Sequence, residues 1–201
     1  MKKGFTLIEI LVVMGIIVLI GGAIMRFGSD IFINNLRQQK TFNNESEAKL
    51  ALSQLVTELR TMSQSNTGTY PIEAVSTSSL IFYSDINKDN LKERVRYFRD
   101  GVVFKKGLVV PTGQPYVYNL SNEKVSTLIS SLASTTEPIF SFYDHSYAGS
   151  TTTEALADPV SIQNIRLIKI NFSVGSTDSF AKPVTINLTS QVTPRNLKDN
   201  L

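Results

Sequence analysis

The chain has 201 residues and a net charge of +3, from 20 Lys and Arg residues against 17 Asp and Glu residues. This length suits one globular domain with an additional segment, and so small an excess of scattered basic residues is weak evidence for a nucleic-acid partner. The lack of cysteine excludes a disulfide scaffold, a thiolate metal site and a cysteine nucleophile. Because His145 is the single histidine, a histidine-rich metal site is excluded too.

An apolar run of about 21 residues, from Phe5 to Met25, follows the basic residues Lys2 and Lys3. As a helix it would span roughly 31 Å, which is the thickness of the hydrocarbon core of a bilayer. A cleaved secretory signal fits less well, because no small-x-small cleavage site follows the run. The two lysines predict a single membrane segment with a cytoplasmic N-terminus and with the following chain outside.

Glu9 interrupts this run, although a lone carboxylate in lipid is energetically costly. It could reach the headgroup boundary of a simple anchor, or it could pair with a positive charge on a neighbouring helix. It belongs to the segment Lys-Lys-Gly-Phe-Thr-Leu-Ile-Glu-Ile-Leu-Val-Val at positions 2–13. This segment closely resembles the leader junction of type IV pilins and type II secretion pseudopilins.

The resemblance implies that a membrane-embedded prepilin peptidase cleaves between Gly4 and Phe5. It also implies N-methylation of Phe5 and a role for Glu9 in aligning subunits within a filament. The implied partners are other pilins or pseudopilins, the prepilin peptidase and an inner-membrane assembly platform. The ammonium group of mature Phe5 and the Glu9 carboxylate could neutralise each other between neighbouring helices, since either charge alone is costly in an apolar bundle.

A second helical pattern follows the apolar run and indicates an amphipathic helix with one buried side. Its apolar residues recur at intervals of three or four: Ala48, Leu52, Leu55, Leu59 and Met62. The polar residues 63–68 predict that this helix ends near Ser65. One continuous helix from Phe5 to about Ser63 would be roughly 90 Å long. The alternative is a short core helix that a flexible break near Gly28 separates from the anchor.

From Tyr70 onward, short segments of alternating apolar residues predict half-buried antiparallel strands. The expected strands cover residues 80–83, 94–99, 102–105, 139–143, 166–174 and 184–192. Asp100-Gly101 predicts a hairpin turn. Residues 121–136 and 146–159 are expected to be surface excursions, the first with a short helix at about 125–132.

A sheet with one apolar face and a helix with one apolar stripe can bury each other, so we expect an α+β fold. The expected organisation is a leader peptide at 1–4, a transmembrane and assembly helix at 5–27, an amphipathic helix at 28–65, and an antiparallel β-rich head at 66–201. Two segments of the head, residues 83–99 and 190–197, resemble J-type pseudopilins and W-type minor pilins.

Oxygen-bearing side chains alternate at Asp85, Asn87 and Asp89, and Glu93 follows at the ninth position of the same count, as in an EF-type calcium loop. The glycine and the bidentate glutamate that such loops carry at the sixth and twelfth positions are missing. Asn and Asp also favour polar turns that bind no metal. Two interpretations therefore stay open: a calcium site formed by these four residues, or a metal-free turn between strands.

Two further groups of residues could carry a function. Basic residues between Lys88 and Lys106 alternate with aromatic ones and could bind DNA, or they could be the solvated face of strands whose aromatic residues point inward. Asp144, His145 and Ser146 contain the residue types of a catalytic triad, but adjacent residues rarely adopt its geometry. No phosphate-binding loop or nucleophile-elbow motif occurs.

We therefore expect a structural subunit and not an enzyme, with no cofactor unless the loop at Asp85 binds calcium. The expected function is that of a minor pilin or pseudopilin in a type IV pilus, a type II secretion pseudopilus or a competence filament. The alternatives are a pilin head that binds DNA or a surface ligand and, less favoured, a membrane-anchored extracytoplasmic enzyme. The expected location is the membrane first, and then a cell-surface or periplasmic filament.

Overall fold

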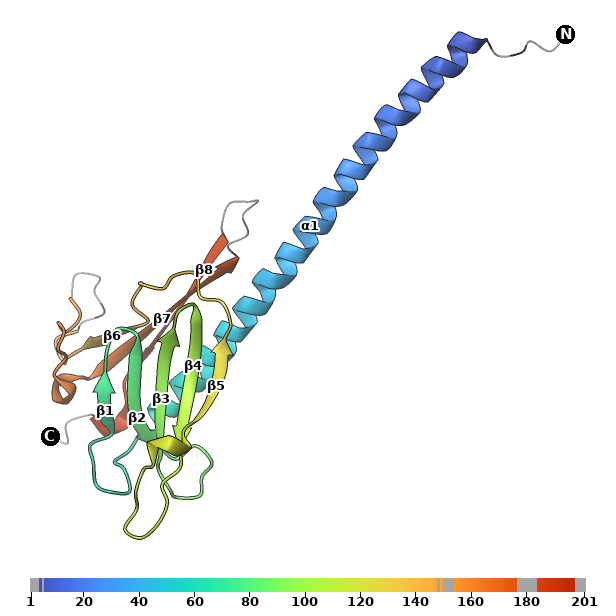
Figure 1. Cartoon of the computed structure of the whole chain (residues 1–201). Helices are drawn as coiled ribbons and strands as arrows, with labels where there is room; N and C mark the ends of the chain where they lie inside the picture. Colours follow the sequence, from blue (N-terminus) through green and yellow to red (C-terminus); the bar gives the residue numbers. More distant parts are fainter. Residues whose placement is uncertain (1–3, 5, 148, 150–153, 177–183, 198–201) are drawn as a thin grey trace. The chain divides into compact units, whose positions relative to one another are not determined.

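The computed structural model describes residues 4, 6–147, 149, 154–176 and 184–197 (Figure 1). The chain forms two compact units, residues Met1–Lys40 and Thr41–Leu201. Helix α1 (Leu7–Arg60) begins in the first unit and ends in the second. It passes through Gly28 without interruption, so the alternative of a flexible break at this position is wrong.

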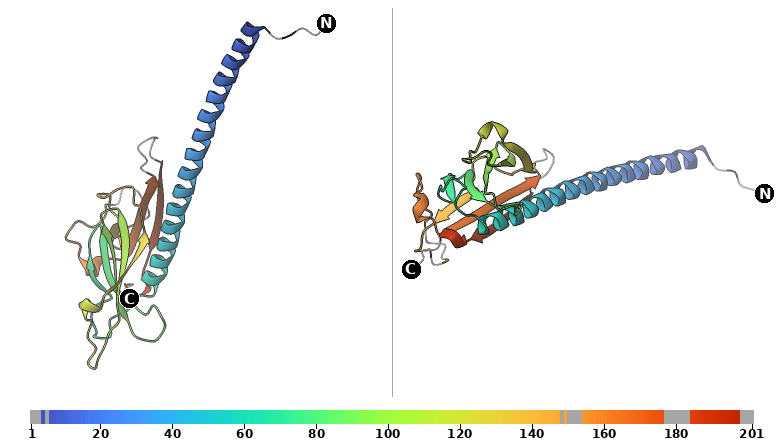
Figure 2. Two further views of the ribbon diagram at one scale, coloured as in Figure 1. Left: turned by 45° about the vertical axis from the view of Figure 1, so that its right-hand side comes forward. Right: turned by 90° about the horizontal axis from the view of Figure 1, so that it is seen from below.

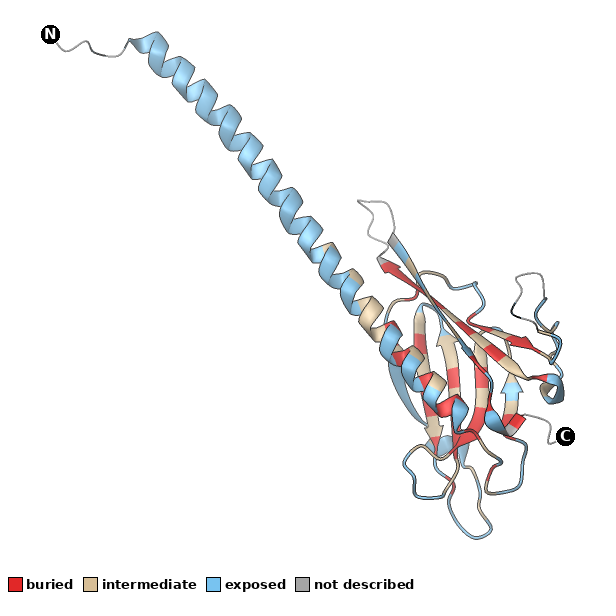
Figure 3. Ribbon diagram, turned by 180° about the vertical axis from the view of Figure 1, so that it is seen from behind, coloured by how far each residue is buried: buried red, intermediate tan, exposed pale blue. Residues whose placement is uncertain are grey.

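In the first unit, the described residues of α1 before Lys40 are exposed apart from Arg37, which is half-buried (Figure 3). Between Leu7 and Met25 every large apolar side chain is at least half exposed, from 50% for Ile16 to 82% for Leu7. This part of α1 is long and apolar enough to cross a membrane. So large an apolar surface is unfavourable in water, and it requires lipid or other apolar helices as its surroundings.

The second unit packs the C-terminal turns of α1 against strands (Figure 2). The predicted apolar stripe is confirmed, because Ala48, Leu55 and Leu59 are fully buried. Polar contacts fix the start of this segment: the Asn44 amide donates to the Gly175 carbonyl (3.1 Å), and the Glu47 carboxylate accepts from the backbone N–H of Ser130 (2.8 Å).

Helix α1 ends at Arg60, earlier than the predicted end near Ser65. The reason is a competing strand: the Ser63 N–H donates to the Tyr83 carbonyl at 3.0 Å, and Met62 forms an isolated β-bridge with Ser84. Backbone pairing with residues 83–84 therefore ends the helix before the polar residues 63–68 are reached.

The strands form two antiparallel sheets, which together with α1 confirm the α+β fold (Figure 1). The five-stranded sheet has the order β1 (Ile72–Val75), β2 (Ser79–Ser84), β3 (Glu93–Asp100), β4 (Val103–Val109) and β5 (Lys124–Ile129). The three-stranded sheet has the order β6 (Phe140–Tyr143), β7 (Leu167–Ser176) and β8 (Val184–Val192). The short 3-10 helices are η1 (Leu120–Asn122), η2 (Ile162–Asn164) and η3 (Arg195–Leu197).

Three details of the sheet differ from the sequence prediction or refine it. The expected helix at 125–132 is wrong, because its β-branched residues form strand β5 on the open edge of β4. Strand β1 was not expected at all. The hairpin is confirmed, but its turn residues are Gly101 and Val102, with Gly101 at φ +61°, so that Asp100 pairs with Val103.

One aromatic cluster joins the two sheets into a single core. Phe82, Tyr97 and Phe104 stack across β2, β3 and β4, with ring centroids 6.0 and 5.9 Å apart. Phe104 also contacts Phe172 of β7, edge to face at 4.8 Å. Burial of such rings is the main favourable contribution to folding, so the two sheets stabilise each other.

A buried ion pair connects α1 to the five-stranded sheet. Lys106 Nζ on β4 lies 2.5 Å from Glu58 Oε1 on α1, and both side chains are only 8% exposed. The Tyr97 hydroxyl on β3 donates to Glu58 Oε2 (2.7 Å), and the Gln54 amide donates to Oε1 (2.9 Å). Burial, reinforced by the Glu58 carboxylate, raises the pKa of Tyr97, which therefore stays a neutral donor.

Replacing Lys106 with methionine should destabilise the second unit by about 3–5 kcal/mol, because the Glu58 carboxylate would be left buried without its cation. Urea unfolding of the full-length protein in detergent, followed by circular dichroism, measures this loss. Lys105→Met is the matched control, since the partner of Lys105, Asp100, is 62% exposed. Equal losses in both variants would contradict a special role for the buried pair.

Candidate functional site

The first turn of α1 is closed by a reciprocal pair of hydrogen bonds between Thr6 and Glu9. The Glu9 Oε2 atom accepts from the backbone N–H of Thr6 (3.1 Å) and from its hydroxyl (3.2 Å), while the Glu9 N–H donates to the Thr6 hydroxyl (3.4 Å). This is a capping box, which satisfies N–H groups that a helix start otherwise leaves unpaired. The local signal for it, Thr-x-x-Glu, was present in the sequence but was not used in the prediction.

The capping box lies directly beside the predicted processing site. Gly4 is described and exposed, whereas Phe5 and residues 1–3 lie outside the described residues. Cleavage between Gly4 and Phe5, methylation of Phe5 and the assembly role of Glu9 therefore stay predictions. Within the described residues, the Glu9 carboxylate is held at the start of the helix by the Thr6 N–H.

Residues 1–25 match the prokaryotic N-terminal methylation motif. The motif includes Gly4, Phe5 and Glu9, the three residues that the sequence predicts for cleavage, methylation and assembly. It describes the start of the chain and leaves the second unit, residues Thr41–Leu201, without a matched family. Searches of curated proteins and of solved structures gave no match for the chain.

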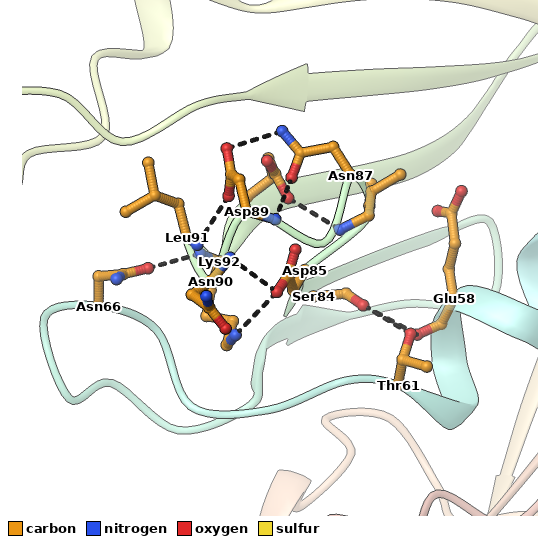
Figure 4. Close-up of polar contacts among 12 residues, drawn as sticks. Glu58, Thr61, Asn66, Ser84, Asp85, Asn87, Asp89, Asn90, Leu91 and Lys92 are labelled. Atoms are coloured by element: carbon orange, nitrogen blue, oxygen red, sulfur yellow. Dashed lines mark hydrogen bonds and ion pairs between the residues drawn. The ribbon is translucent and has the colours of Figure 1, made fainter.

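Beyond the methylation motif, three of the four predicted calcium residues, Asp85, Asn87 and Asp89, lie in the loop between β2 and β3 (Figure 4), and the fourth, Glu93, is the first residue of β3. Asp85 Oδ2 accepts from the Asn90 N–H (3.1 Å) and from Lys92 Nζ (3.3 Å). Asn87 Oδ1 accepts from the Asp89 N–H at 3.1 Å. The loop thus has the internal hydrogen bonds of a polar turn, and calcium binding stays a prediction.

Glu93 stands apart from the other three predicted ligands because it is almost fully buried, at 1% exposure. Its Oε2 atom accepts from the backbone N–H of Ile86 at 3.0 Å, so its carboxylate lies against the start of the same loop. Among the described residues, no group of three or more His, Asp or Glu side chains is gathered around one point that could hold a metal ion. Any cation here would need amide, backbone or water oxygens as well.

Six of the seven basic residues between Lys88 and Lys106, all but Lys88, are paired with the chain's own acceptors. Each of the following contacts is a hydrogen bond or ion pair: Lys92 with Asp85, Arg94 with Glu73, Arg96 with Glu123, Arg99 with the Glu137 carbonyl, Lys105 with Asp100, and Lys106 with Glu58. Phosphate groups would have to compete with these carboxylates. The aromatic residues Tyr97 and Phe104 are fully buried, so they are unavailable for stacking on bases.

Two of these pairs are bidentate, the geometry that makes arginine–carboxylate contacts strong. Arg94 binds Glu73 of β1 through two nitrogens (2.7 and 2.8 Å), and the Tyr83 hydroxyl donates to the same carboxylate (2.6 Å). The hydrogen bond from Arg94 lowers the pKa of Glu73, against the opposing effect of burial. The network ties edge strand β1 to β2 and β3.

The second bidentate pair crosses a whole strand. Glu123 precedes β5, yet it reaches Arg96 on β3 (2.8 and 2.5 Å) by passing over Gly107 of β4. A Cβ atom at Gly107 would lie 2.3 Å from Glu123 Oε1. The Arg96 guanidinium also stacks on Phe98, 3.9 Å from the ring centroid. Glycine at this position therefore makes room for the ion pair.

The adjacent Asp144, His145 and Ser146 do not form a catalytic arrangement. Asp144 Oδ1 accepts directly from the Ser146 N–H (2.9 Å) and hydroxyl (2.6 Å), and these bonds lower the pKa of Asp144. His145 is exposed. A triad needs the histidine between the acid and the nucleophile, whereas here the acid binds the hydroxyl without it.

Acid should weaken the network around Glu73. Because the folded state lowers the pKa of Glu73 below its ordinary value of 4.5, the pair with Arg94 contributes its full stability above that pH and loses it as the pH falls further. Glu73→Gln should cost about 1 kcal/mol at pH 7, a value reduced by partial exposure, and should flatten the pH dependence below pH 5. Urea unfolding at pH 7, 5, 4 and 3 checks this. Parallel pH profiles for the variant and the wild type would contradict it.

Proposed function

We propose that the chain is a type IV pilin-like structural subunit, anchored by the first part of α1 and later assembled with other pilins. The observation that carries this proposal is the methylation motif at residues 1–25. It joins directly to a helix whose apolar side chains are exposed. A surface of this kind can lie first in lipid and then against other apolar helices, which is what transfer from a membrane into a filament requires.

Within this class, we favour a minor pilin or pseudopilin that primes or caps a type IV pilus, a type II secretion pseudopilus or a competence filament. The second unit supports this choice because it carries two sheets of five and three strands, more than a simple repeating subunit needs. The resemblance of residues 83–99 and 190–197 to J-type pseudopilins and W-type minor pilins supports it further. Lys2 and Lys3 favour a cytoplasmic N-terminus with the head outside.

The proposal includes no enzymatic activity and no DNA binding. The direct bond between Asp144 and Ser146 argues against a catalytic site around His145. The pairing of the basic residues on β3 and β4 with carboxylates argues against a phosphate-binding surface. Such a subunit would function through its contacts with other chains.

Processing is the first test of the proposed function. Co-expression with a prepilin peptidase should yield a chain that begins at N-methylated Phe5, as read by intact mass and N-terminal sequencing. Gly4→Ala should remain uncut. Gly15→Ala is the matched control, because an added Cβ has open space at both glycines. An unprocessed wild type, or equal processing of both variants, would contradict the proposal.

Assembly can be separated from helix capping at the Thr6–Glu9 pair. Glutamine at position 9 can still complete a capping box but lacks the charge, whereas Thr6→Ala removes the cap and keeps the charge. If charge pairing drives assembly, Glu9→Gln would leave the ammonium group of mature Phe5 without its partner. An uncompensated charge in an apolar bundle costs more than about 1.4 kcal/mol, so incorporation into filaments should fall at least about tenfold.

Quantitative immunoblotting of sheared filaments against whole cells measures this ratio, with peptidase cleavage monitored in the same samples. Thr6→Ala should assemble nearly as well as the wild type. Normal assembly of Glu9→Gln together with failure of Thr6→Ala would assign the role to the cap and would refute charge pairing.

A further inference from the structure

Two carboxylate oxygens at the loop between β2 and β3 are buried without a hydrogen-bond partner among the described residues: Asp85 Oδ1 in the loop and Glu93 Oε1 at the start of β3. Glu93 is only 1% exposed. A buried carboxylate oxygen without a donor is unfavourable. Glu58 shows the contrast, because each of its carboxylate oxygens accepts at least one hydrogen bond.

Both unpaired oxygens belong to one local structure. Glu93 Oε2 accepts from the N–H of Ile86, the residue that follows Asp85, so the Glu93 carboxylate is directed into the loop from the start of β3. Lys92 reaches Asp85 Oδ2 (3.3 Å) and leaves Oδ1 unpaired. Residues 85–93 contain three carboxylates and two lysines, so an excess of negative charge remains.

The loop is shaped to keep further oxygens together. The Asn90 N–H holds Asp85 Oδ2, and the Asp89 N–H holds Asn87 Oδ1, which fixes the side chains of the first and third positions over the turn (Figure 4). Asn90 adopts φ +69°, and so supplies at the sixth position the left-handed backbone that a tight turn requires. These bonds orient the loop. A bound cation would supply the missing partner of the two unpaired carboxylate oxygens.

We propose that this loop binds a calcium ion, with Asp85 Oδ1 and Glu93 Oε1 as its charged ligands. The Asn87 amide, backbone carbonyls and water would complete the shell, because no third acidic side chain among the described residues gathers at the same point. Calcium is the cation that fits, because every donor is an oxygen and because calcium accepts irregular shells of six to eight ligands, whereas magnesium demands near-ideal octahedral geometry. Two carboxylates and a competing lysine make the site weak, with a Kd of about 0.1–1 mM. The inference does not rest on the proposed function.

The test uses full-length protein in detergent, stripped of metal with a chelating resin. Isothermal titration with CaCl2 should give one site in the Kd range stated above. Saturating calcium should raise the Tm by about 2–4 °C, and MgCl2 at the same concentration should have much less effect. Terbium luminescence excited through tyrosine offers a second readout, because the chain has seven tyrosines and no tryptophan.

Asp85→Asn and Glu93→Gln should each weaken calcium binding at least about tenfold. Asp100→Asn is the matched control, since it removes one carboxylate at the other end of β3, in the β3–β4 hairpin, and should bind like the wild type. Without calcium, Glu93→Gln should have a Tm equal to or above that of the wild type, because it removes a buried charge that lacks a cation. Asp85 is less buried, so its variant tests the site even if Glu93→Gln fails to fold.

Three results would overturn the inference. The first is no heat and no Tm shift with calcium up to 10 times the upper expected Kd, about 10 mM. The second is unchanged calcium binding in both Asp85→Asn and Glu93→Gln. The third is an equal loss of binding in Asp100→Asn, which would indicate a diffuse charge effect in place of a defined site.

Discussion

The buried contact between Glu58 and Lys106 is the constraint on which the rest of the head depends. Removing two charges from water is costly, and the attraction between them offsets that cost only if both are present and fully hydrogen-bonded. Glu58 meets this condition through Lys106, Tyr97 and Gln54. Since Leu55 and Leu59 flank Glu58 on the buried side of α1, rotating the helix about its axis would remove the carboxylate from Lys106 and the leucines from the core together. The pair therefore fixes how α1 lies on β3 and β4.

The same rule explains the surface of the five-stranded sheet. Arginines on β3 project toward the carboxylates of neighbouring segments, Arg94 toward Glu73 and Arg96 toward Glu123. Each contact joins β3 to a segment that is not its neighbour in sequence, and Gly107 leaves the space that the contact of Arg96 with Glu123 needs. These ion pairs within the chain neutralise the arginines of a strand face that could otherwise bind a negatively charged partner. The loop between β2 and β3 is the exception, because two of its buried carboxylate oxygens have no such partner within the described residues.

What the sequence could predict depended on how local each signal is. The methylation motif, the apolar run and the stripe of α1 are patterns within single segments, and the alternating strands β2, β3, β7 and β8 are too. Strand β1 is only four residues long and β5 carries a mixed polar sequence, so both form because a partner strand is available. Residues 58 and 106 are 48 positions apart, and no local pattern connects them. The capping box at Thr6 and Glu9 is also local, because its Thr-x-x-Glu spacing lies within four residues.

Helix α1 carries two glutamates in apolar surroundings, and they obey one physical requirement in different ways. Glu58 finds its cation within the chain, on β4. Glu9 lies among exposed apolar side chains, and the bonds it makes in the described residues are to the neutral Thr6. A capping box satisfies hydrogen bonds but does not neutralise charge, so the contacts of Glu9 within the described residues leave its carboxylate without a cation. The energetic cost that Lys106 relieves at Glu58 would have to be relieved at Glu9 by a further positive charge, as in the charge pairing proposed above for assembly.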